Sequence, residues 1–561
     1  MKKEIQQLVI EAAEATGVLI SDELKSKITV TYPDAKIGDY ATNAALILAK
    51  EAKMKPVELA TQLIAKMNVS DFEKVEVAGP GFINFRLKPE ALVSKIIDSS
   101  EQITKPEKIL VEYFQPNVAK PLHLGHLETA VIGDTIYRQL KYLGHQVESD
   151  THMGDWGTQF GQLLLAYKKY GNEGIVESDP INELNKLYVK INEEITKHPT
   201  LHEEAKEEFV KLEKGDSENR AIWKKFVDWS LEKHLKINEL MNIQLFDHHW
   251  PESFYQDKMP AILMDLKGRG LLKESQGAQI VDLESQGLGI ALIVKSDGGT
   301  TYLLRDLATF VYRKSLGFNK QLYVVDVRQA HAFKQLFAIL KLLGYMHDEE
   351  AVHIDYGFMS FKGEALSSRK GNMVLAEDVI AQAKEKVEKI IAEKNPNLSD
   401  ADYVIPAVAQ AAIKYFILSH NRHSDIEFDW DKALDFEGNS GPYLQYTHAR
   451  LASILRKAGN HVIGDRLQGT IVMSLTERQI LFQTAILPEI VADSLEDYLP
   501  NVLANYLYNF ATLLNRFYHE SPVTQEPDEA VKNYRIALVF SAKKALSRGL
   551  DLLGIEALEE M

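Results

Sequence analysis

Residues 110–134 read LVEYFQPNVAKPLHLGHLETAVIGD, and they predict a strand, a loop and a helix in that order. Residues 109–111 are an apolar run that is typical of a buried strand, and apolar residues then recur at helical spacing. In such a unit the helix begins at the carboxyl edge of a parallel sheet, where free N–H groups and the helix dipole favour a phosphate. His123 and His126 would flank that position, and Gly125 would let a flat base or a phosphate lie against the backbone.

The pattern His-x-Gly-His is the nucleotide signature of class I aminoacyl-tRNA synthetases and of small adenylyl- and cytidylyltransferases. On its own, it fits equally well a helix start with two partly exposed histidines. The longer segment resembles the arginyl-tRNA synthetase family, whose signature runs E-[FY]-x-x-P-N-x-A-K-x-x-H-x-G-H. The positions that match are Glu112, Pro116, Asn117, Ala119, Lys120, His123, Gly125 and His126.

The composition indicates a large cytoplasmic enzyme. At 561 residues, the chain predicts roughly three or four domains, each with its own core. Hydrophobic residues make up 45%, and no apolar run approaches the ~18 residues that span a bilayer, so we expect no membrane segment. The first residues, MKKEIQQLVIEAAEATG, are interrupted by acids and predict an amphipathic helix rather than a signal peptide. Because the chain has no cysteine, a disulfide and a thiolate zinc site are excluded.

The net charge of −16 argues against a nucleic-acid partner, because phosphate binding normally shows as an excess of basic residues. Any nucleic-acid surface must therefore be local. Arg450, Arg456 and Lys457 form such a stripe on one predicted helix. Without other support, a run of this kind predicts only a solvated helix face.

The pattern along the chain predicts three regions. Residues 1–105 combine helices with short strands and predict a small α+β domain. Residues 106–375 alternate strands with amphipathic helices, which indicates a Rossmann-like, doubly wound parallel sheet. Within them, the block at about 165–260 is rich in lysine and glutamate and predicts a helical insertion. Residues 376–561 show almost no strand pattern and predict an all-α region.

The resemblance also gives meaning to segments that are ambiguous by themselves. HMGDWGTQFG, residues 152–161, is very like a segment that the family carries at this distance, although a βα turn with Trp156 in the core would explain it as well. The residues that match the family's arginine pocket are Glu112, Asn117, Tyr302, Asp306 and Gln329, with Asn117 at the α-amino end, and we add Trp156. A guanidinium needs carboxylates to pair with it and an aromatic or amide group to fix its plane. Taken singly, Asp306 predicts a surface ion pair with Arg305, and Tyr302 a half-buried strand residue.

Residues 366–372, LSSRKGN, resemble the mobile KMSKS-type loop of class I synthetases, in which basic groups hold the triphosphate while pyrophosphate leaves. The loop departs from the pattern. Ala365 stands where the leading lysine belongs and Leu366 where the methionine does, which leaves Arg369 and Lys370 as the cations. Arginyl enzymes often have a degenerate loop, and the resemblance implies that a lysine just before His-x-Gly-His, here Lys120, compensates. As alternatives without function, residues 366–372 would form a solvated basic turn, and Lys120 would be a solvated loop lysine.

Both ends of the chain resemble the family's tRNA-binding regions. Phe82-Ile83-Asn84 matches a position where an aromatic and an asparagine contact a D-loop base, and Phe82 can stack but lacks the hydroxyl of a tyrosine. The helical end, which closes with GLDLLGIEALEEM, resembles the anticodon-binding domain, although amphipathic helices by default predict only a bundle. The residues that we assign to tRNA are Phe82, Asn84, Tyr446, Arg450 and Met561.

The resemblance spans essentially the whole chain and implies ATP-dependent ligation of L-arginine to tRNA(Arg) through an arginyl-adenylate. It implies ATP with Mg²⁺, no protein-bound zinc and no membrane contact, and we expect a monomer. The implied catalytic residues are His123, His126, Lys120, Arg369 and Lys370, and the ATP-binding residues are His123, Gly125, His126, Ser367, Ser368 and Lys370.

Two alternative functions remain open. A small-molecule nucleotidyltransferase would not need the arginine-pocket set, and a catalytically silent tRNA-binding paralogue would have lost site residues that this chain retains.

Overall fold

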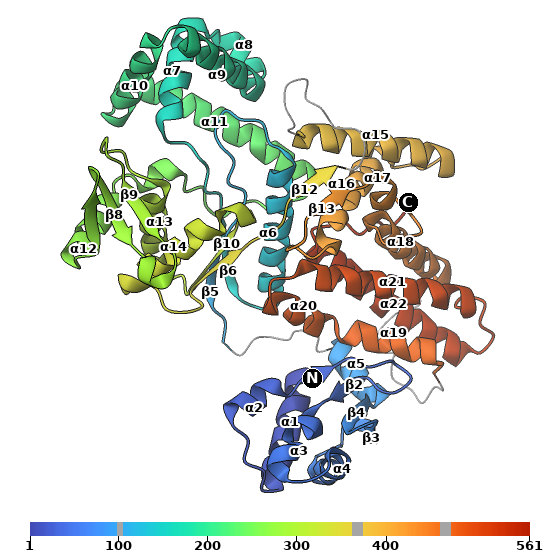
Figure 1. Ribbon diagram of the computed structural model, residues 1–561. Helices are drawn as coiled ribbons and strands as arrows, with labels where there is room; N and C mark the ends of the chain where they lie inside the picture. Colours follow the sequence, from blue (N-terminus) through green and yellow to red (C-terminus); the bar gives the residue numbers. More distant parts are fainter. Residues whose placement is uncertain (98–104, 362–373, 460–472) are drawn as a thin grey trace.

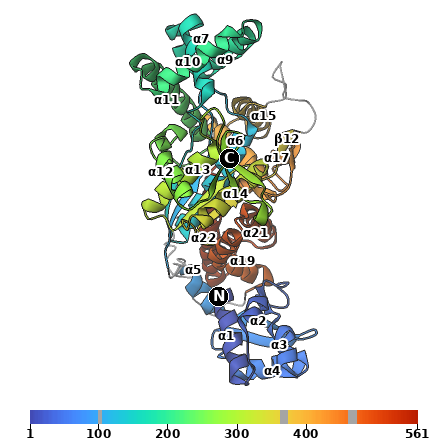
Figure 2. The ribbon, with the colours of Figure 1, turned by 60° about the vertical axis from the view of Figure 1, so that its left-hand side comes forward.

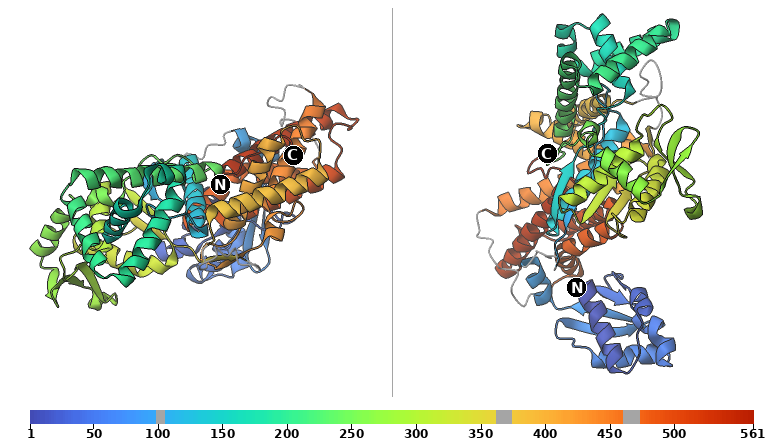
Figure 3. Two further views of the ribbon diagram at one scale, coloured as in Figure 1. Left: turned by 90° about the horizontal axis from the view of Figure 1, so that it is seen from above. Right: turned by 90° about the vertical axis from the view of Figure 1, so that its left-hand side faces the viewer.

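The computed structural model describes residues 1–97, 105–361, 374–459 and 473–561. Figure 1 shows the N-terminal region below the C-terminal helices, a parallel sheet at the centre, and a helical insertion at the top. In Figure 2 and in the right-hand view of Figure 3, the insertion and the N-terminal region lie at opposite ends of an elongated molecule.

The N-terminal region contains an antiparallel sheet in the order β1-β2-β4-β3. Its strands are β1 (Val30–Thr31), β2 (Tyr40–Thr42), β3 (Phe72–Ala78) and β4 (Phe82–Leu87), and its helices are α1 (Lys2–Ala15), α2 (Asp22–Lys27), α3 (Ala44–Ala52), α4 (Pro56–Lys66) and α5 (Pro89–Ile97). In β4, Ile83, Phe85 and Leu87 alternate toward the core and are fully buried. Gly79 and Gly81 turn the chain between β3 and β4 at φ values of 52° and 134°, which glycine adopts readily.

The central sheet is parallel, in the order β11-β10-β5-β6, as the alternation of strands and helices predicts. Its strands are β5 (Lys108–Glu112), β6 (Gln146–Asp150), β10 (Lys320–Val324) and β11 (Ala351–Ile354). Successive side chains point to opposite faces. Val111 and Leu322 share a core with α6 (Leu124–Tyr142). Glu112, Asp150 and Tyr323 point to the other face, toward α13 (Tyr302–Ser315) and α14 (Ala330–Leu342).

Helices occupy the block for which the sequence predicts an insertion. They are α7 (Thr158–Tyr170), α8 (Glu173–Ser178), α9 (Pro180–Lys197), α10 (Thr200–Glu213) and α11 (Ser217–Leu240), followed by the short η1 (Glu252–Tyr255) and by α12 (Met259–Gly268). An antiparallel sheet that the sequence analysis does not predict comes next: β7 (Leu272–Ser275), β8 (Ala278–Asp282) and β9 (Ile290–Val294), with η2 (Glu284–Gln286) between the last two. Gly277, Gly287 and Gly289 adopt positive φ in its turns, which is the signal that marks it.

The C-terminal third is helical, as predicted, except for β13 (Ile426–Phe428), which pairs in parallel with β12 (Met359–Phe361). Its helices are α15 (Ala376–Lys394), α16 (Ala401–Ser419), α17 (Trp430–Ala433), α18 (Gly441–Ala458), α19 (Leu475–Ala485), α20 (Leu487–Glu496), α21 (Pro500–Glu520) and α22 (Glu529–Leu552). Among the described helices, α16 alone is long and apolar enough to cross a membrane. Because 72% of its apolar 18-residue window is buried inside the fold, it packs here as a core helix.

Buried polar contacts hold the N-terminal region against α19 and α20. Asp39 Oδ2 accepts a hydrogen bond of 2.7 Å from Arg478 Nη2, and the hydroxyl of Tyr40 donates to Glu489 Oε1 at 3.0 Å. The ring of Tyr40 also lies edge-on to Phe482, with 5.6 Å between centroids. Tyr40, Asp39 and Glu489 are all buried, so separating the two regions would break these hydrogen bonds and expose the apolar contact between Tyr40 and Phe482 to water.

Helix α6 lies between the sheet and the C-terminal helices and contacts α16, α20, α21 and α22 (Figure 1). Gly133 allows it to sit directly on the sheet. A Cβ atom at Gly133 would lie 2.3 Å from Cβ and Cγ of Tyr113, at the end of β5. One close contact therefore sets the distance between the sheet and α6, the helix whose first turn carries the two histidines.

We expect Gly133→Ala to lower the free energy of unfolding by about 1–3 kcal/mol or more, the cost of overpacking a close-packed core. Thermal unfolding followed by circular dichroism measures the change. Gly268→Ala is the matched control, because this glycine ends α12 and a Cβ atom there would meet no other side chain or distant backbone atom within 4 Å. Equal melting temperatures for the two variants would contradict the close approach.

Candidate active site

The two histidines lie at the first turn of α6, where the sequence predicts them. The backbone N–H of His123 donates to Nδ1 of His126 at 3.1 Å, and the ring centroids are 3.9 Å apart. A Cβ at Gly125 would lie 3.2 Å from Cε1 of His123, so the glycine lets the ring lie close to the helix. Burial lowers the pKa of both histidines, that of His126 to about 3. Both rings are therefore neutral near pH 7 and can act as hydrogen-bonding groups rather than as cations.

The loop before α6 lies against the HMGDWG loop that follows β6. The N–H of Gly154 donates to the carbonyl of Pro116 at 3.0 Å, and the N–H of Val118 donates to the carbonyl of Gly154 at 3.1 Å. A Cβ at Gly154 would lie 2.4 Å from Oδ1 of Asn117. Since the glycine admits the Asn117 amide, the two loops form one continuous wall of the site.

Trp156 lies in the core of the helical insertion. It is 4% exposed and packs edge-on to Phe209 and Trp223, each 5.7 Å away between ring centroids. Its predicted role in arginine binding stays a prediction.

Helix α13 carries Tyr302, Asp306, Thr309 and Arg313 at the spacing of one helix face. Asp306 is half-buried, and no described residue donates a hydrogen bond to it or forms an ion pair with it. Burial and the neighbouring Glu112 raise the pKa of Asp306 to about 7. An unpaired carboxylate in such a place is a ready partner for a cationic ligand.

The single-residue alternatives for this segment do not describe the structure. The guanidinium of Arg305 donates to Glu252 Oε2 at 2.9 Å, so Arg305 is paired with that residue and not with Asp306. Tyr302 is the first residue of α13 and is 65% exposed, so it is not a half-buried strand residue.

Sequence reasoning missed the buried partner of Glu112. Arg313 is fully buried, and its guanidinium donates to Glu112 Oε2 and to Asp150 Oδ2, each at 2.5 Å. Burial by itself raises the pKa of Glu112, but Arg313 more than offsets this and holds it below its usual value. Glu112, Asp150 and His152 bring their ligand atoms within 4.8 Å of one another, a spacing that suits a metal ion. The guanidinium already meets the charge of both carboxylates there.

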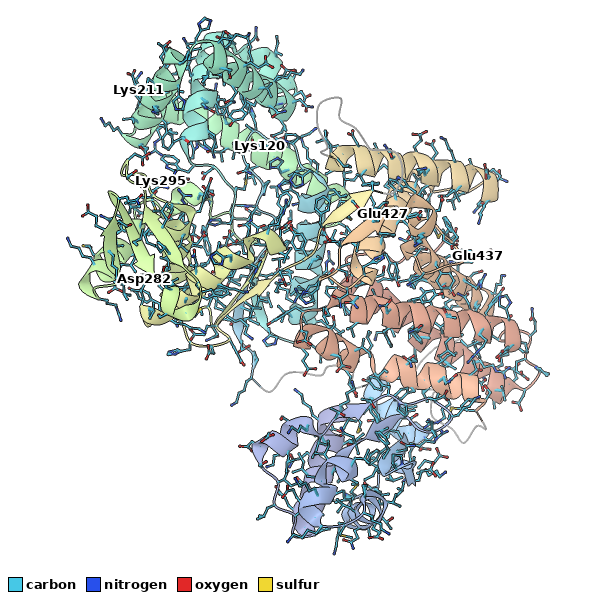
Figure 4. The ribbon with its side chains drawn as sticks, viewed as in Figure 1. Lys120, Lys211, Asp282, Lys295, Glu427 and Glu437 are labelled. Atoms are coloured by element: carbon cyan, nitrogen blue, oxygen red, sulfur yellow. The ribbon has the colours of Figure 1, made fainter. Side chains whose placement is uncertain are left out.

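Lys120 is exposed, with its ammonium 6.0 Å from the centre of the Tyr188 ring on α9, and it lies between the insertion and the start of α6 (Figure 4).

Gln329 is exposed in η3 (Val327–Gln329), directly after β10. It therefore shares the carboxyl edge of the sheet with the histidines. The predicted phosphate-binding residues Ser367, Ser368, Arg369 and Lys370 lie outside the described residues.

A second concave site lies among the C-terminal helices. Tyr446, Arg450 and Met561 line one pocket of about 560 Å³ together with Tyr443 and His519. The guanidinium of Arg450 lies 4.7 Å from the centre of the Tyr446 ring. At the other end of the molecule, Phe82 is 39% exposed, whereas Asn84 is buried at 4%. The contact predicted for these two residues stays a prediction, with Phe82 offering the open ring.

Comparisons with known proteins cover the whole chain. Residues 89–430 match the family described as tRNA synthetases class I (R), catalytic domain; residues 2–87 match the arginyl tRNA synthetase N terminal domain, and residues 444–561 match the DALR anticodon binding domain. The arginine–tRNA ligase of Alkaliphilus metalliredigens is 39% identical over 100% of this chain and 99% of its own. The arginine–tRNA ligase of Ligilactobacillus salivarius is also 39% identical, over 100% of both chains. The arginyl-tRNA synthetase structure of Thermus thermophilus is 27% identical, with a TM-score of 0.85 and full coverage of both chains.

Proposed function

This chain belongs to the arginyl-tRNA synthetase family, and we propose that the carboxyl edge of its parallel sheet binds ATP beside the histidines and L-arginine beside α13. The activity is ligation of L-arginine to tRNA with consumption of ATP. The observation that carries the proposed site is Asp306, an unpaired carboxylate beside Glu112. The direct test is attachment of labelled arginine to total tRNA, measured against the other amino acids. Charging with another amino acid in preference to arginine would overturn the assignment.

The reaction needs no side-chain nucleophile. The carboxylate of L-arginine is ionised at neutral pH and attacks the α-phosphorus of ATP, which forms arginyl-adenylate as the bond to pyrophosphate breaks. A terminal ribose hydroxyl of the tRNA then takes the arginyl group, and AMP leaves. The protein contributes position and charge stabilisation. His123 and His126 donate hydrogen bonds to the phosphates as neutral imidazoles, and Lys120 supplies a positive charge with Arg369 and Lys370.

The arginine pocket follows from the carboxylate that is left unpaired. Asp306 meets the guanidinium of the substrate, and Glu112, held by Arg313, lines the pocket beside it. Tyr302 covers the guanidinium at the entrance, and Asn117 holds the α-amino end next to Gly154. Gln329 and Trp156 complete the predicted set. A neutral or shorter side chain would leave a buried carboxylate without a partner, and rejection on this basis can reach ~10⁴ to 10⁵. We therefore expect no separate editing step.

Two surfaces are proposed for tRNA. The pocket of Tyr446, Arg450 and Met561 has an aromatic face and a cation, which suit an unstacked anticodon base. Phe82 offers a ring at the far end of the molecule. We further infer tRNA(Arg) as the substrate, Mg²⁺ carried by ATP, a monomer, and a cytoplasmic location.

Asp306→Asn should raise the KM for arginine by about 10- to 100-fold, because it removes a charge-assisted hydrogen bond worth ~1.5–3 kcal/mol. The KM for ATP should not change. Asp282→Asn is the control, since this exposed acid pairs with Lys273 on the small antiparallel sheet. If Asp306→Asn loses affinity for ATP but keeps its affinity for arginine, Asp306 does not belong to the arginine pocket.

The raised pKa of Asp306 gives a second signature. Because the pKa is about 7 in the free enzyme, protonation should weaken arginine binding as the pH falls from 8 to 6. The KM for arginine should therefore rise on the acid side in the wild type and stay flat in Asp306→Asn. The same pH profile in both proteins would contradict this source of the dependence.

Lys120→Ala should lower kcat for aminoacylation by about two orders of magnitude, the loss typical of one preorganised donor in a transition state. The KM for arginine should change little. Lys211→Ala is the control, because this lysine is exposed on α10, away from Lys120, and only pairs with Glu208 (Figure 4). If kcat for Lys120→Ala stays close to that of the wild type, then Arg369, Lys370 or another group replaces the lysine that is missing at position 365.

Phe82→Ala should raise the KM for tRNA about fivefold or more, since stacking of one base on an aromatic ring is worth ~1–3 kcal/mol. The KM values for arginine and ATP should stay the same. Leu19→Ala removes another exposed apolar side chain of this region, 90% exposed, and should have no effect. Equal tRNA kinetics for the two variants would remove Phe82 from the tRNA surface.

A further inference from the structure

A guanidinium from the protein itself occupies the deep end of the proposed arginine pocket. Arg313 follows Asp306 by two turns on the same face of α13 and is 0% exposed. Glu112 and Asp150 are direct neighbours in the register of β5 and β6, and Arg313 bridges them with two hydrogen bonds of 2.5 Å. Two buried carboxylates on adjacent strands repel each other, so without this cation one of them would take up a proton.

The remaining oxygens of both carboxylates are held from other directions. Glu112 Oε1 accepts from the side-chain amide of Gln115 at 3.3 Å, and Asp150 Oδ1 accepts from the backbone of Trp250 at 2.9 Å. The two acids are thus fixed in orientation as well as in charge. Asp306 lacks any such partner among the described residues.

Other polar atoms around Arg313 are buried without a partner in the described part of the chain. They include Thr309 Oγ1, which lies between Asp306 and Arg313 on the helix face, and Nε of Arg313 itself. His152 Nδ1, from the loop after β6, is a third. Buried polar atoms of this kind are normally satisfied by water or by a ligand. The face of α13 between Asp306 and Arg313 therefore carries a polar atom, Thr309 Oγ1, that can bond to a ligand.

We propose that Arg313 is a specificity-determining positioning residue that pairs with Glu112 and Asp150 and so directs the guanidinium of the substrate to Asp306. Without Arg313, the two deeper carboxylates would compete for the substrate cation, and arginine would enter too far for its carboxylate to reach the α-phosphate. Lysine cannot replace it fully, because one ammonium does not present the planar fork that bridges two carboxylates. The inference rests on the proposed arginine pocket.

Arg313→Met, which keeps an unbranched chain without the charge, should raise the KM for arginine about tenfold or more and lower kcat, with the KM for ATP unchanged. Arg313→Lys should recover part of the loss. Asp150→Asn is the gentler variant, because it removes one anchor of Arg313 without a change of shape, and it should also raise the KM for arginine alone. Circular dichroism checks that each variant is folded.

Chemical rescue separates positioning from mere support of the fold. Millimolar guanidinium chloride, far below denaturing concentrations, should lower the KM for arginine in Arg313→Ala, because the ion fills the vacated place. In the wild type, the same ion should raise that KM by competing at Asp306. Urea, which has a similar shape and no charge, should do neither.

Each result decides one question. An unchanged KM for arginine in both Arg313→Met and Asp150→Asn would overturn the role of Arg313, even if Asp306→Asn behaves as expected. If Arg313→Met does not fold, the KM for arginine in Asp150→Asn decides alone. Loss of effect in Asp306→Asn as well would instead refute the proposed pocket.

Discussion

The enclosure of helix α6 is the constraint on which the rest of the structure depends. Its first turn carries the histidines, its middle rests on the sheet at Gly133, and its second half meets the C-terminal region. The contact with that region is buried and largely apolar, and it also contains polar groups. Lys414 of α16 donates to the carbonyl of Gly554 at 2.9 Å and lies 3.5 Å from Asp134 of α6.

This junction joins parts of the chain that are remote in sequence. Lys414 also donates to the carbonyl of Asn242 at the end of the insertion, and burial lowers its pKa to about 7. Arg138 pairs with Asp134 on the same helix at 2.9 Å. Because an unpaired charge here would be costly, the insertion, α6 and the C-terminal segment are held in one relative position. The site at the start of α6 therefore depends on contacts made at its far end.

The sequence is informative where the chemistry is local. The run through β5, the loop and His-x-Gly-His predicts the strand and the helix start within one stretch of chain, and the proposed phosphate side of the site lies there. The strand alternation likewise predicts the parallel sheet. Arg313 could not be predicted, because nothing near it in the sequence shows that it contacts β5 and β6 on the face of the sheet opposite α6. The same holds for Lys414, which looks like a break in an apolar helix, and for the strands β7 to β9, which are too short for a clear period.

The seat of the N-terminal region on α19 and α20 has a geometric consequence. Because Asp39, Tyr40 and Glu489 would lose buried partners if this region swung away, Phe82 is held at a set separation from the pocket of Tyr446. A nucleic acid that meets both places must present two of its parts at that spacing. The protein would then select an RNA by the distance between two parts of its folded structure, and not only by the identity of its bases. Unfolded or shortened RNAs would fail this measurement even with every contacted base in place.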